Sequence, residues 1–553
     1  MRQFFLLISL SIFSFFQIKA QTVGTLSLED DALNGYTFFS PFSGTKSWMV
    51  NNCGELINVW DRDFRPGLSA YFLDNGLMMR TYKPNPIGPF NSASNSGGIE
   101  LVDWDNNTVW SYELNNSEEI SHHDAVYMPN GNILLLTWEL VYEDELVELG
   151  RDPAEIAFQG FMWSERIIEV KPVGNNEIDI MWEWGIKNHY IQDLDSTKLN
   201  FGVIAEHPEL FNINLPELDS NDSHPSRDWN HFNAIDYNED LDQILISVRN
   251  SDEIWILDHS TTSQEAASHE GGNAEKGGDI LYRWGNASAY NRAPVSDQKF
   301  FGQHGVHWVK EGLNDAGKIM IFNNGNGRPG PDYSTIELLE PPQDTDGNYI
   351  SADDVPFLPE TSEVVYGDQA SEEFFSAYLS NAQRLPNENT LIMAGSPGRI
   401  FEINPNREIV WAYEIPLSGD NPGTQGGNIS GNASFRGYKF TPDFTGFDGI
   451  EIEVGETIEN GENPLDCDLS TATIAILKTA ISANFHQGQL EILNPNFNEM
   501  NLRMVDIAGR VRWFKNGVSD GQLTAFLNLE NGIYFLNIQT ENGNTFTKSI
   551  LNF

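Results

Sequence analysis

Short runs of β-branched and aromatic residues, bounded by Gly, Asn, Asp and Pro, recur along the whole chain, whereas helix signals are scarce. Such runs are typical of the strands of an all-β protein. A hydrophobic residue followed by an aromatic one closes a run six times, at intervals of 50, 72, 100, 84 and 45 residues. The pairs are Val59-Trp60, Val109-Trp110, Met181-Trp182, Leu281-Tyr282, Val365-Tyr366 and Val410-Trp411. The loose period predicts a repeated unit whose insertions lie in loops.

A second repeat lies between these pairs and begins with polar residues ahead of a strand. Its members start at His122-His123-Asp124-Ala125, His231-Phe232-Asn233-Ala234, His304-Gly305-Val306-His307 and Ser380-Asn381-Ala382, and a second strand follows each after a turn. Six units of this kind predict a six-bladed β-propeller, in which radial repetition leaves only short strand edges. A pair of β-sandwiches is the alternative.

The composition changes near residue 446 and divides the chain into parts. An acidic, turn-rich stretch over 446–482 is typical of a linker. Beyond it, runs over 490–493, 501–507 and 533–538 alternate as strands, so 483–553 is expected to form a small β-sandwich. The propeller is then expected over 21–445.

The amino-terminal segment is typical of an export signal. Arg2 precedes a mostly apolar run from Phe4 to Phe16, and Ala20 precedes Gln21. This pattern predicts a signal peptide over 1–20 that is too short to span a bilayer. Because no later apolar run approaches about 18 residues, we expect a protein that is secreted or held at the cell surface without membrane insertion.

Charge narrows the possible partners. The 553 residues include 80 Asp and Glu against 32 Lys and Arg, which gives a formal charge of −48. A polyphosphate or an anionic membrane would be repelled by such a chain, so nucleic acid is not expected as a partner. Hydrophobic residues make up 40% of the chain and are enough for a large core.

The histidines are placed unevenly with respect to the repeat. His122, His123, His231 and His304 stand at strand starts, and His307 follows three residues later. In a propeller, residues at the same phase of different blades meet around the central channel, so this group is a candidate site.

Two arginines stand in similar polar contexts. Arg328 ends the segment Phe322-Asn323-Asn324-Gly325-Asn326-Gly327-Arg328, and Arg249 ends Ile246-Ser247-Val248-Arg249. A guanidinium offers planar, bidentate hydrogen bonding to an oxyanion. In so acidic a chain, Arg and His in the channel would make a local anion site.

Several of these segments together resemble the arylsulfate sulfotransferase family. They are Asp228-Trp229-Asn230-His231-Phe232-Asn233-Ala234-Ile235, Ile246-Ser247-Val248-Arg249-Asn250, Phe301-Gly302-Gln303-His304-Gly305-Val306, the Arg328 segment, Ala382-Gln383-Arg384-Leu385-Pro386-Asn387-Glu388-Asn389-Thr390-Leu391 and Gly398-Arg399-Ile400-Phe401-Glu402-Ile403. The resemblance implies a six-bladed propeller that moves a sulfuryl group from a phenolic sulfate ester to a phenolic acceptor, without the nucleotide donor PAPS. It implies no metal and no cofactor, and the chain has no Gly-rich P-loop motif.

The resemblance carries over to single residues. His231 and His304 match two family histidines and Arg328 matches the family arginine, while Arg249, Asn324 and Gln303 are expected to bind substrate. The family histidine that carries the sulfuryl group has no counterpart: Leu379 and Ser380 stand opposite His122 and His123. Either His122 or His123 takes this role from the other side of the ring, or the covalent step is altered or lost.

The carboxy-terminal tail resembles the sorting domain of the Bacteroidetes type IX secretion system. The matching segments are Val505-Asp506-Ile507-Ala508-Gly509-Arg510-Val511, Gly532-Ile533-Tyr534-Phe535-Leu536 and Lys548-Ser549-Ile550-Leu551-Asn552. The resemblance implies export across both membranes with the secretion machinery as a partner. In that oxidising route, Cys53 and Cys467 either pair in a disulfide or stay as two free thiols.

Three functions are consistent with these observations. The first is an exported arylsulfotransferase that uses a histidine to carry the group between two phenols. The second is a non-catalytic propeller that binds a sulfated or other anionic ligand. The third is an aryl sulfate hydrolase, in which water replaces the phenolic acceptor.

Overall fold

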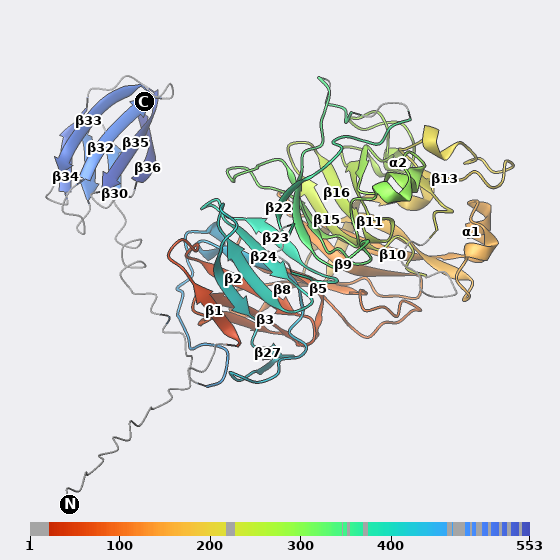
Figure 1. Ribbon diagram of the computed structural model, residues 1–553, viewed down its shortest axis with the longest axis horizontal. Helices are drawn as coiled ribbons and strands as arrows, with labels where there is room; N and C mark the ends of the chain where they lie inside the picture. The colour runs from red at the N-terminus through yellow and green to blue at the C-terminus, as the bar shows by residue number, and fades with distance from the viewer. Residues whose placement is uncertain are drawn as a thin grey trace, which may run out of the picture. The chain divides into compact units, whose positions relative to one another are not determined.

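The computed structural model describes residues 22–216, 227–345, 347–350, 354–368, 374–461, 467, 482–486, 489–493, 500–506, 510–518, 522–527, 532–540 and 545–552. The predicted signal peptide over 1–20 lies outside these residues. By its internal contacts the chain divides into two units, residues 1–466 and 467–553. Figure 1 shows the many strands of the first unit and the separate strands of the second.

Six antiparallel sheets make up the first unit and confirm the predicted six-bladed propeller. Each sheet is written here from its innermost strand outward. The first is β29 (Ser434–Phe440), β2 (Tyr36–Pro41), β3 (Lys46–Asn51) and β4 (Leu56–Asp61), and the second is β5 (Pro66–Phe72), β6 (Met78–Tyr82), β7 (Gly98–Val102) and β8 (Thr108–Glu113). The third is β9 (Glu119–Tyr127), β10 (Ile133–Tyr142), β11 (Phe161–Val173) and β12 (Glu177–Gly185), and the fourth is β15 (Phe232–Asn238), β16 (Gln243–Val248), β17 (Glu253–Asp258) and β18 (Tyr282–Trp284). The fifth is β19 (His304–Trp308), β20 (Ile319–Asn323), β21 (Thr335–Leu339) and β22 (Glu363–Tyr366), and the sixth is β23 (Asn381–Arg384), β24 (Thr390–Ala394), β25 (Arg399–Ile403), β26 (Ile409–Glu414) and β1 (Gly24–Leu28).

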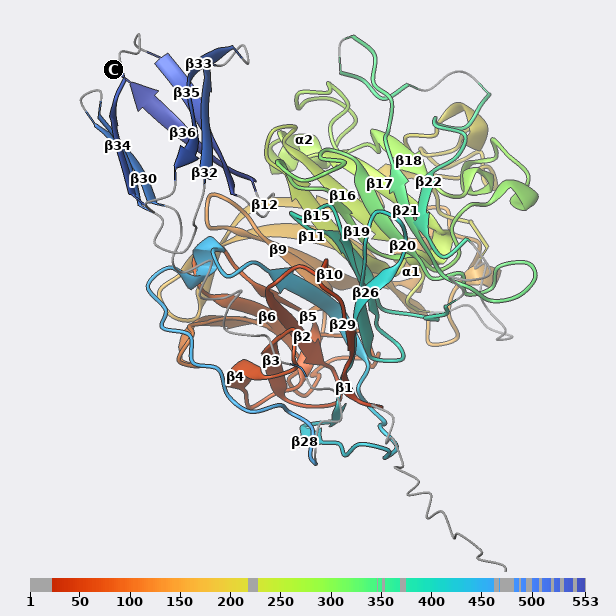
Figure 2. The ribbon, with the colours of Figure 1, turned by 60° about the vertical axis from the view of Figure 1, so that its left-hand side comes forward.

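Both ends of the propeller sequence help to close the ring. The last strand, β29, pairs with β2 and becomes the inner strand of the first sheet, while the first strand, β1, pairs with β26 at the outer edge of the sixth. The inner strands β5, β9, β15, β19, β23 and β29 then contact one another in a closed cycle. Figure 2 shows β29 among the strands of the amino-terminal blades.

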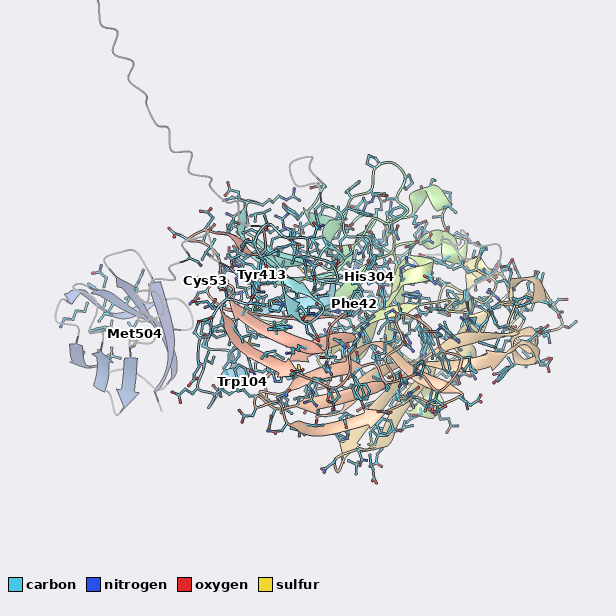
Figure 3. The ribbon with its side chains drawn as sticks, turned by 90° about the horizontal axis from the view of Figure 1, so that it is seen from below. Phe42, Cys53, Trp104, His304, Tyr413 and Met504 are labelled. Carbon is cyan, nitrogen blue, oxygen red and sulfur yellow. The ribbon has the colours of Figure 1, made fainter. Side chains whose placement is uncertain are left out.

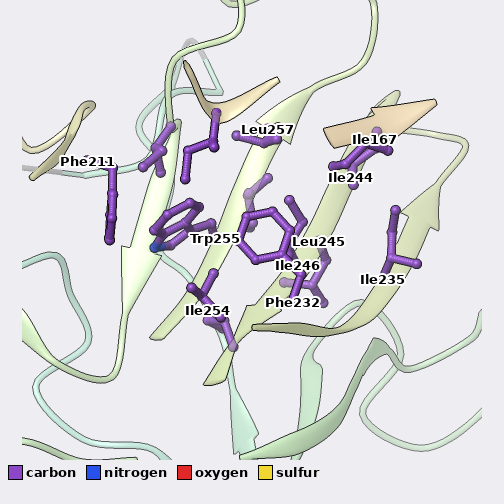
Figure 4. Packing of buried hydrophobic residues seen from close by; sticks show 14 of the residues in the cluster. Ile167, Phe211, Phe232, Ile235, Ile244, Leu245, Ile246, Ile254, Trp255 and Leu257 are labelled. Carbon is purple, nitrogen blue, oxygen red and sulfur yellow. The ribbon is translucent and has the colours of Figure 1, made fainter. Parts of the chain in front are cut away.

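The six hydrophobic-aromatic pairs mark the outer part of the six blades. Each pair lies on or immediately before the fourth strand of its sheet, and each aromatic side chain is buried. Because side chains alternate between the two faces of a strand, these aromatic side chains lie at the interface between neighbouring sheets. Figure 4 shows similar packing in the third and fourth blades, where Phe232 and Trp255 meet at a ring-centroid distance of 5.6 Å and Ile167 joins the same cluster.

The remaining elements are short. The helices are α1 (Glu143–Glu148) and α2 (Ser263–Ala266), with 3-10 turns at Pro153–Glu155, Ile186–His189, Ile204–Glu206, Arg249–Ser251, Ala287–Tyr290, Val295–Asp297 and Thr445–Phe447. Two small two-stranded sheets pair β13 (Tyr190–Ile191) with β14 (Phe211–Asn212) and β27 (Leu417–Ser418) with β28 (Asn421–Pro422). Within the part of the chain that the structure describes, none of the helices has the length and apolar character needed to cross a membrane.

The second unit contains two antiparallel sheets. One is formed by β30 (Ser482–His486), β31 (Gln489–Leu493) and β34 (Gln522–Phe526), and the other by β33 (Val511–Val518), β32 (Met500–Asp506), β35 (Gly532–Thr540) and β36 (Thr545–Asn552). These strands agree with the predicted small β-sandwich. Residues 507–509 of the sorting-domain resemblance lie outside the described residues.

Part of the predicted linker belongs to the propeller unit. Phe447 and Ile458 are buried, the Leu56 N–H donates to the Glu456 carbonyl oxygen at 3.0 Å, and the Gly455 N–H donates to the Leu56 carbonyl oxygen at 2.8 Å. The acidic composition of this stretch obscured these regularly placed apolar residues. Cys53 and Cys467 are both disulfide-bonded, so neither is a free thiol.

His259 joins the third and fourth blades through two carboxylates. Its Nδ1 lies 2.7 Å from Asp242 Oδ1 and its Nε2 lies 3.1 Å from Glu169 Oε2. Burial favours the neutral ring, but the two carboxylates outweigh this effect and raise the pKa of His259. The charged ring therefore stabilises the folded state.

The sign of this shift predicts how His259→Gln changes stability with pH. A raised folded-state pKa gives stability that is complete below the unfolded value of about 6.5 and is lost as the pH rises through the folded value. The variant should lose roughly 1–2 kcal/mol at pH 5.5 and much less at pH 9. Unfolding midpoints at the two pH values test this, with exposed His207→Gln as the control. An equal loss at both pH values would show that the charge of His259 contributes nothing.

Candidate active site

Left-handed backbone occurs in or just before the inner strands of five blades. Positive φ angles are found at Leu68 (130°), His123 (45°), His231 (57°), Gly305 (61°), Leu379 (62°) and Ser380 (91°), the last two on the same blade. This conformation costs a bulky side chain of the order of 1–3 kcal/mol and persists where the surroundings enforce it, often at functional sites. A β-bulge follows from it in the pairing of four of these strands with their neighbours. The bulges direct side chains of different blades toward one another.

Gly305 shows why one of these positions requires glycine. A Cβ on this residue would lie 2.7 Å from the Ser380 carbonyl oxygen and 2.8 Å from the Asn381 Cα. The absence of a side chain therefore lets β19 approach β23 closely and sets the position of the neighbouring His304.

His304 is held in one tautomer. Its Nδ1 lies 2.8 Å from Asn324 Oδ1 and 2.9 Å from the Gly302 carbonyl oxygen. The orientation of the Asn324 amide is fixed because its Nδ2 donates to two further carbonyl oxygens, those of Ser376 and Leu379. Since both neighbours of His304 Nδ1 are acceptors, Nδ1 carries the hydrogen and Nε2 carries the lone pair.

The surroundings also keep His304 neutral. Burial and the positive charge of Arg249 lower the pKa of His304 to about 3, in spite of the hydrogen bond from Nδ1 to Asn324. A neutral imidazole with a fixed, unprotonated Nε2 is the form that acts as a nucleophile. It would keep this form at any pH above about 5, roughly two units above that pKa.

A continuous line of five titratable groups runs beside His304. His122 Nε2 lies 3.0 Å from Glu165 Oε2, His122 Nδ1 lies 2.8 Å from His123 Nδ1, and His123 Nε2 lies 3.1 Å from His231 Nε2. His231 Nδ1 in turn lies 2.6 Å from Asp228 Oδ2. We call Glu165, His122, His123, His231 and Asp228 the histidine relay.

The proton count of the relay follows from these contacts. Three of its contacts are hydrogen bonds, and the fourth, between His122 Nε2 and Glu165 Oε2, is a close approach without hydrogen-bond geometry. All four join atoms that both carry lone pairs when unprotonated, so each contact needs one proton to avoid repulsion. Three neutral imidazoles supply three protons, and the relay therefore holds one more. Burial lowers the pKa of His123 well below its usual value, and a positive charge on either neighbour, His231 or His122, lowers it further. The additional proton thus belongs near one of the two carboxylate ends.

The two ends of the relay differ in exposure. His122 is fully buried, stacks on Trp138 at a centroid distance of 4.0 Å, and faces Glu165, which also accepts hydrogen bonds from Trp138 Nε1 and the Phe232 N–H. His231 has 19% of its side chain exposed and is the most accessible of the three histidines. A proton can therefore leave or enter the relay at His231.

The two predicted arginines occupy different positions. Arg249 is the charge that acts on His304 and also on His123. Its Nη1 donates to Asn250 Oδ1 at 2.8 Å. Arg328 instead stacks 4.0 Å from the Tyr333 ring centroid, and its Nη2 donates to Thr335 Oγ1 at 3.4 Å.

Gln303 does not have the role that the sequence indicated. It is fully buried, and its Nε2 donates to the Glu253 carbonyl oxygen at 2.8 Å, with longer contacts to Ser247 Oγ and the Val248 carbonyl oxygen. The Gln303 side chain points into the fourth blade, whereas that of the adjacent His304 faces Asn324 and Phe435. Gln303 joins two blades and does not line the site, whereas Asn324 orients His304.

Ser380 occupies the position opposite His122 and His123 that lacked a histidine. It is buried, its Oγ lies 2.9 Å from Ser376 Oγ, and it accepts a hydrogen bond from the Gly395 N–H at 2.9 Å. These contacts give Ser380 a role in holding the loop before β23.

An apolar cluster adjoins the histidines. Phe435 on β29 is buried, and its ring centroid lies 6.5 Å from that of His123 and 6.4 Å from that of His304. Leu68, Leu379 and Ala433 pack with Phe435, and the half-buried Phe42 covers them. Figure 3 labels Phe42 and His304 within the propeller unit. Of these five residues, Phe42 is only half-buried, and the other four are buried.

Arg249, the neutral His304, the histidine relay and the apolar cluster thus lie together near the inner strands, and these are the kinds of group that the handling of an anion calls for. The sequence pattern of the arylsulfotransferase (ASST) family matches residues 98–410, more than half of the chain. The chain therefore belongs to the arylsulfotransferase family.

Solved structures that resemble this chain have little sequence in common with it. A protein of unknown function from Bacteroides caccae is 10% identical, with 68% of this chain and 93% of that chain covered and a TM-score of 0.36. A catalytically inactive virginiamycin B lyase from Staphylococcus aureus, solved with quinupristin, is 13% identical, with 73% and 91% covered and a TM-score of 0.31. The periplasmic gluconolactonase of Pseudomonas aeruginosa is 10% identical, with 69% and 97% covered and a TM-score of 0.33. No curated protein matches the sequence.

Proposed function

We propose that the protein is a PAPS-independent aryl sulfate sulfotransferase in which His304 carries the sulfuryl group between a phenolic donor and a phenolic acceptor. The observation that carries the proposal is the fixed tautomer of His304, whose Nδ1 donates to Asn324 and Gly302 while Nε2 stays unprotonated. Family membership supports the reaction class. This assignment differs from both sequence-based alternatives, in which either His122 or His123 replaces the missing family histidine or the covalent step is altered or lost.

In the first half-reaction, His304 Nε2 attacks the sulfur of the aryl sulfate. An N–S bond forms, the S–O bond to the aryl group breaks, and the phenolate leaves with the electron pair. Arg249 compensates charge on the sulfonate oxygens, and the additional proton of the histidine relay passes from His231 to the phenolate. The products are phenol and a sulfohistidine, and the relay is one proton short.

In the second half-reaction, the acceptor phenol restores the starting state. Its proton passes to the histidine relay through His231, its oxygen attacks sulfur, and the N–S bond breaks with the electron pair returning to His304 Nε2. The relay regains the proton that it lost, so both halves balance without another co-reactant. Two phenols use the same site in turn, as in a ping-pong mechanism.

Turnover of 4-nitrophenyl sulfate with and without phenol tests the reaction class. A transferase releases nitrophenol at a rate that rises with phenol and forms phenyl sulfate in equal amount. Phenol-independent release would indicate a hydrolase. Binding of the aryl sulfate without release, by a folded protein, would indicate a propeller that only binds an anionic ligand.

The apolar cluster predicts the effect of Phe42→Ala. Removing this half-buried aromatic side chain from the apolar cluster should raise KM for 4-nitrophenyl sulfate about tenfold and leave kcat within about twofold. The reason is that the lost contact would stabilise the ground state and the transition state equally. Steady-state kinetics measures both constants, and the exposed Phe158→Ala serves as the control. An unchanged KM would show that Phe42 does not contact the aryl group of the substrate.

We further propose that the protein is exported and then released or held at the cell surface. The signal pattern over 1–20 and the resemblance of 483–553 to a type IX sorting domain support this proposal. Deletion of 483–553 should leave the protein in the periplasm of a host with that secretion system, whereas the full chain should reach the exterior. Equal export of both forms would contradict the role of the tail.

A further inference from the structure

Three metal-ligating side chains meet in the third and fourth blades, on elements that take no part in the histidine relay. His189 ends the 3-10 turn after β12, His269 follows α2, and Asp279 precedes β18. Asp279 Oδ1 lies 2.8 Å from His189 Nδ1 and 2.7 Å from His269 Nδ1. Among the described residues, this is the one group of three such side chains whose ligand atoms all lie within 4.8 Å of one another.

The hydrogen bond of Nε2 determines which nitrogen of a neutral His189 carries the hydrogen. Its Nε2 lies 2.9 Å from the Ala266 carbonyl oxygen, which only accepts hydrogen bonds, so the ring hydrogen is on Nε2. In a neutral ring, the lone pair of Nδ1 then faces the lone pairs of Asp279 Oδ1. Both side chains are almost fully buried, so this contact needs either a second ring proton or a metal ion between them.

The surroundings hold His189 in this orientation. Its ring lies parallel to Trp184 at an interplanar angle of 5° and a centroid distance of 5.5 Å. Gly278 leaves the space, since a Cβ there would lie 2.0 Å from the Ala266 carbonyl oxygen and 2.7 Å from His189 Nε2. A ring hydrogen donated to a backbone carbonyl is the usual support for a histidine whose other nitrogen binds a metal.

We propose that His189, His269 and Asp279 bind a divalent transition-metal ion, with Zn²⁺ the ion that suits the donor set. Two imidazole nitrogens and one carboxylate oxygen are ligands that Zn²⁺ prefers, and three protein ligands leave one position for water. The exposed side chain of His269, at 58%, gives the ion a path from solvent, while His189 and Asp279 form the buried side. The ion would take the place of the proton between His189 Nδ1 and Asp279 Oδ1 and would tie the loop after α2 to the third blade.

The experiment measures zinc binding by the full mature chain, produced without a histidine tag and stripped with a chelator. Calorimetric titration with ZnCl₂ and metal content after desalting are compared for the unaltered protein, His269→Ala and Asp279→Asn. His207→Ala is the control, because His207 is exposed and pairs with a carboxylate, that of Glu209, at 2.9 Å. His269 lies at the surface, so its variant is expected to stay folded.

The proposal predicts one zinc ion per chain for the unaltered protein and for His207→Ala, and an affinity at least about tenfold lower for His269→Ala and Asp279→Asn. Zinc should also raise the unfolding midpoint of the unaltered protein by about 2 °C or more, and that of His269→Ala by less. Failure to retain zinc would show that His189 is instead a buried imidazolium paired with Asp279. Equal zinc affinity of His269→Ala and the unaltered protein would place any bound zinc elsewhere. Either result overturns the proposal, and neither depends on sulfuryl transfer.

Discussion

Replacing His304 with glutamine is expected to lower kcat/KM for sulfuryl transfer at least about 10³-fold, because the side chain that forms the bond to sulfur is lost. Glutamine retains polarity and similar length but has no nucleophilic nitrogen. Rapid mixing with 4-nitrophenyl sulfate should show that the variant loses the initial burst of nitrophenol as well as steady turnover. In His304→Ala, whose short side chain leaves the space of the ring empty, added imidazole should restore part of the release.

The matched control is His307→Gln on the same strand. His307 is half-buried and also neutral, since partial burial lowers its pKa to about 4, and its Nδ1 donates to the Gly305 carbonyl oxygen. Any loss that comes only from disturbing β19 should appear in both variants. Equal activity of His304→Gln and His307→Gln would show that His304 does not carry the sulfuryl group.

Replacing Glu165 with glutamine is expected to lower steady-state turnover about 10²-fold through the histidine relay. Glu165 contacts His122 and would not contact the sulfur atom of the substrate. It is therefore a positioning residue, which acts on the proton of the relay. Without its charge, the additional proton is held less well and the acceptor phenol loses its proton more slowly. The variant should therefore be least impaired with acidic phenols, which are already ionised, and most impaired with weakly acidic ones.

Glu169→Gln is the control for this experiment. Glu169 lies on the same strand, β11, and contacts His259 outside the relay. The dependence on acceptor acidity should stay unchanged in this variant, whereas a merely structural defect of β11 would affect all acceptors equally in both. A uniform loss across acceptors in Glu165→Gln would contradict a role in proton transfer.

The propeller could be predicted from the sequence because its repeats are local. The aromatic residue on each fourth strand, such as Trp60 or Trp411, fills the interface between blades, so the packing requires an aromatic side chain at the same phase each time. The closure of the ring by β29 and β1 could not be predicted from a local sequence repeat, because it joins segments about 400 residues apart. The apolar residues of 447–461 were likewise hidden in an acidic stretch that packs on the first blade.

The candidate site was predictable only in part. His123, His231 and His304 share a phase of the repeat, and the structure brings them together. Asp228 stands three residues before His231 and could have been found from that spacing, whereas Glu165 lies on a different strand from His122 and has no local signal. Gln303 was assigned from a family motif, but its side chain is turned into the blade. The role expected of Arg328 stays a prediction: its guanidinium packs on Tyr333, and its Nε has no hydrogen-bond partner among the described residues.

The most direct test of His304 as the sulfuryl carrier is mass spectrometry of the protein quenched after reaction with an aryl sulfate in the absence of acceptor. The proposed mechanism predicts the added mass of one SO₃ group on the peptide that contains His304, its loss on addition of phenol, and its absence from His304→Gln. The added group on His123, His231 or no residue at all, in a protein that still transfers sulfuryl groups, would contradict the account.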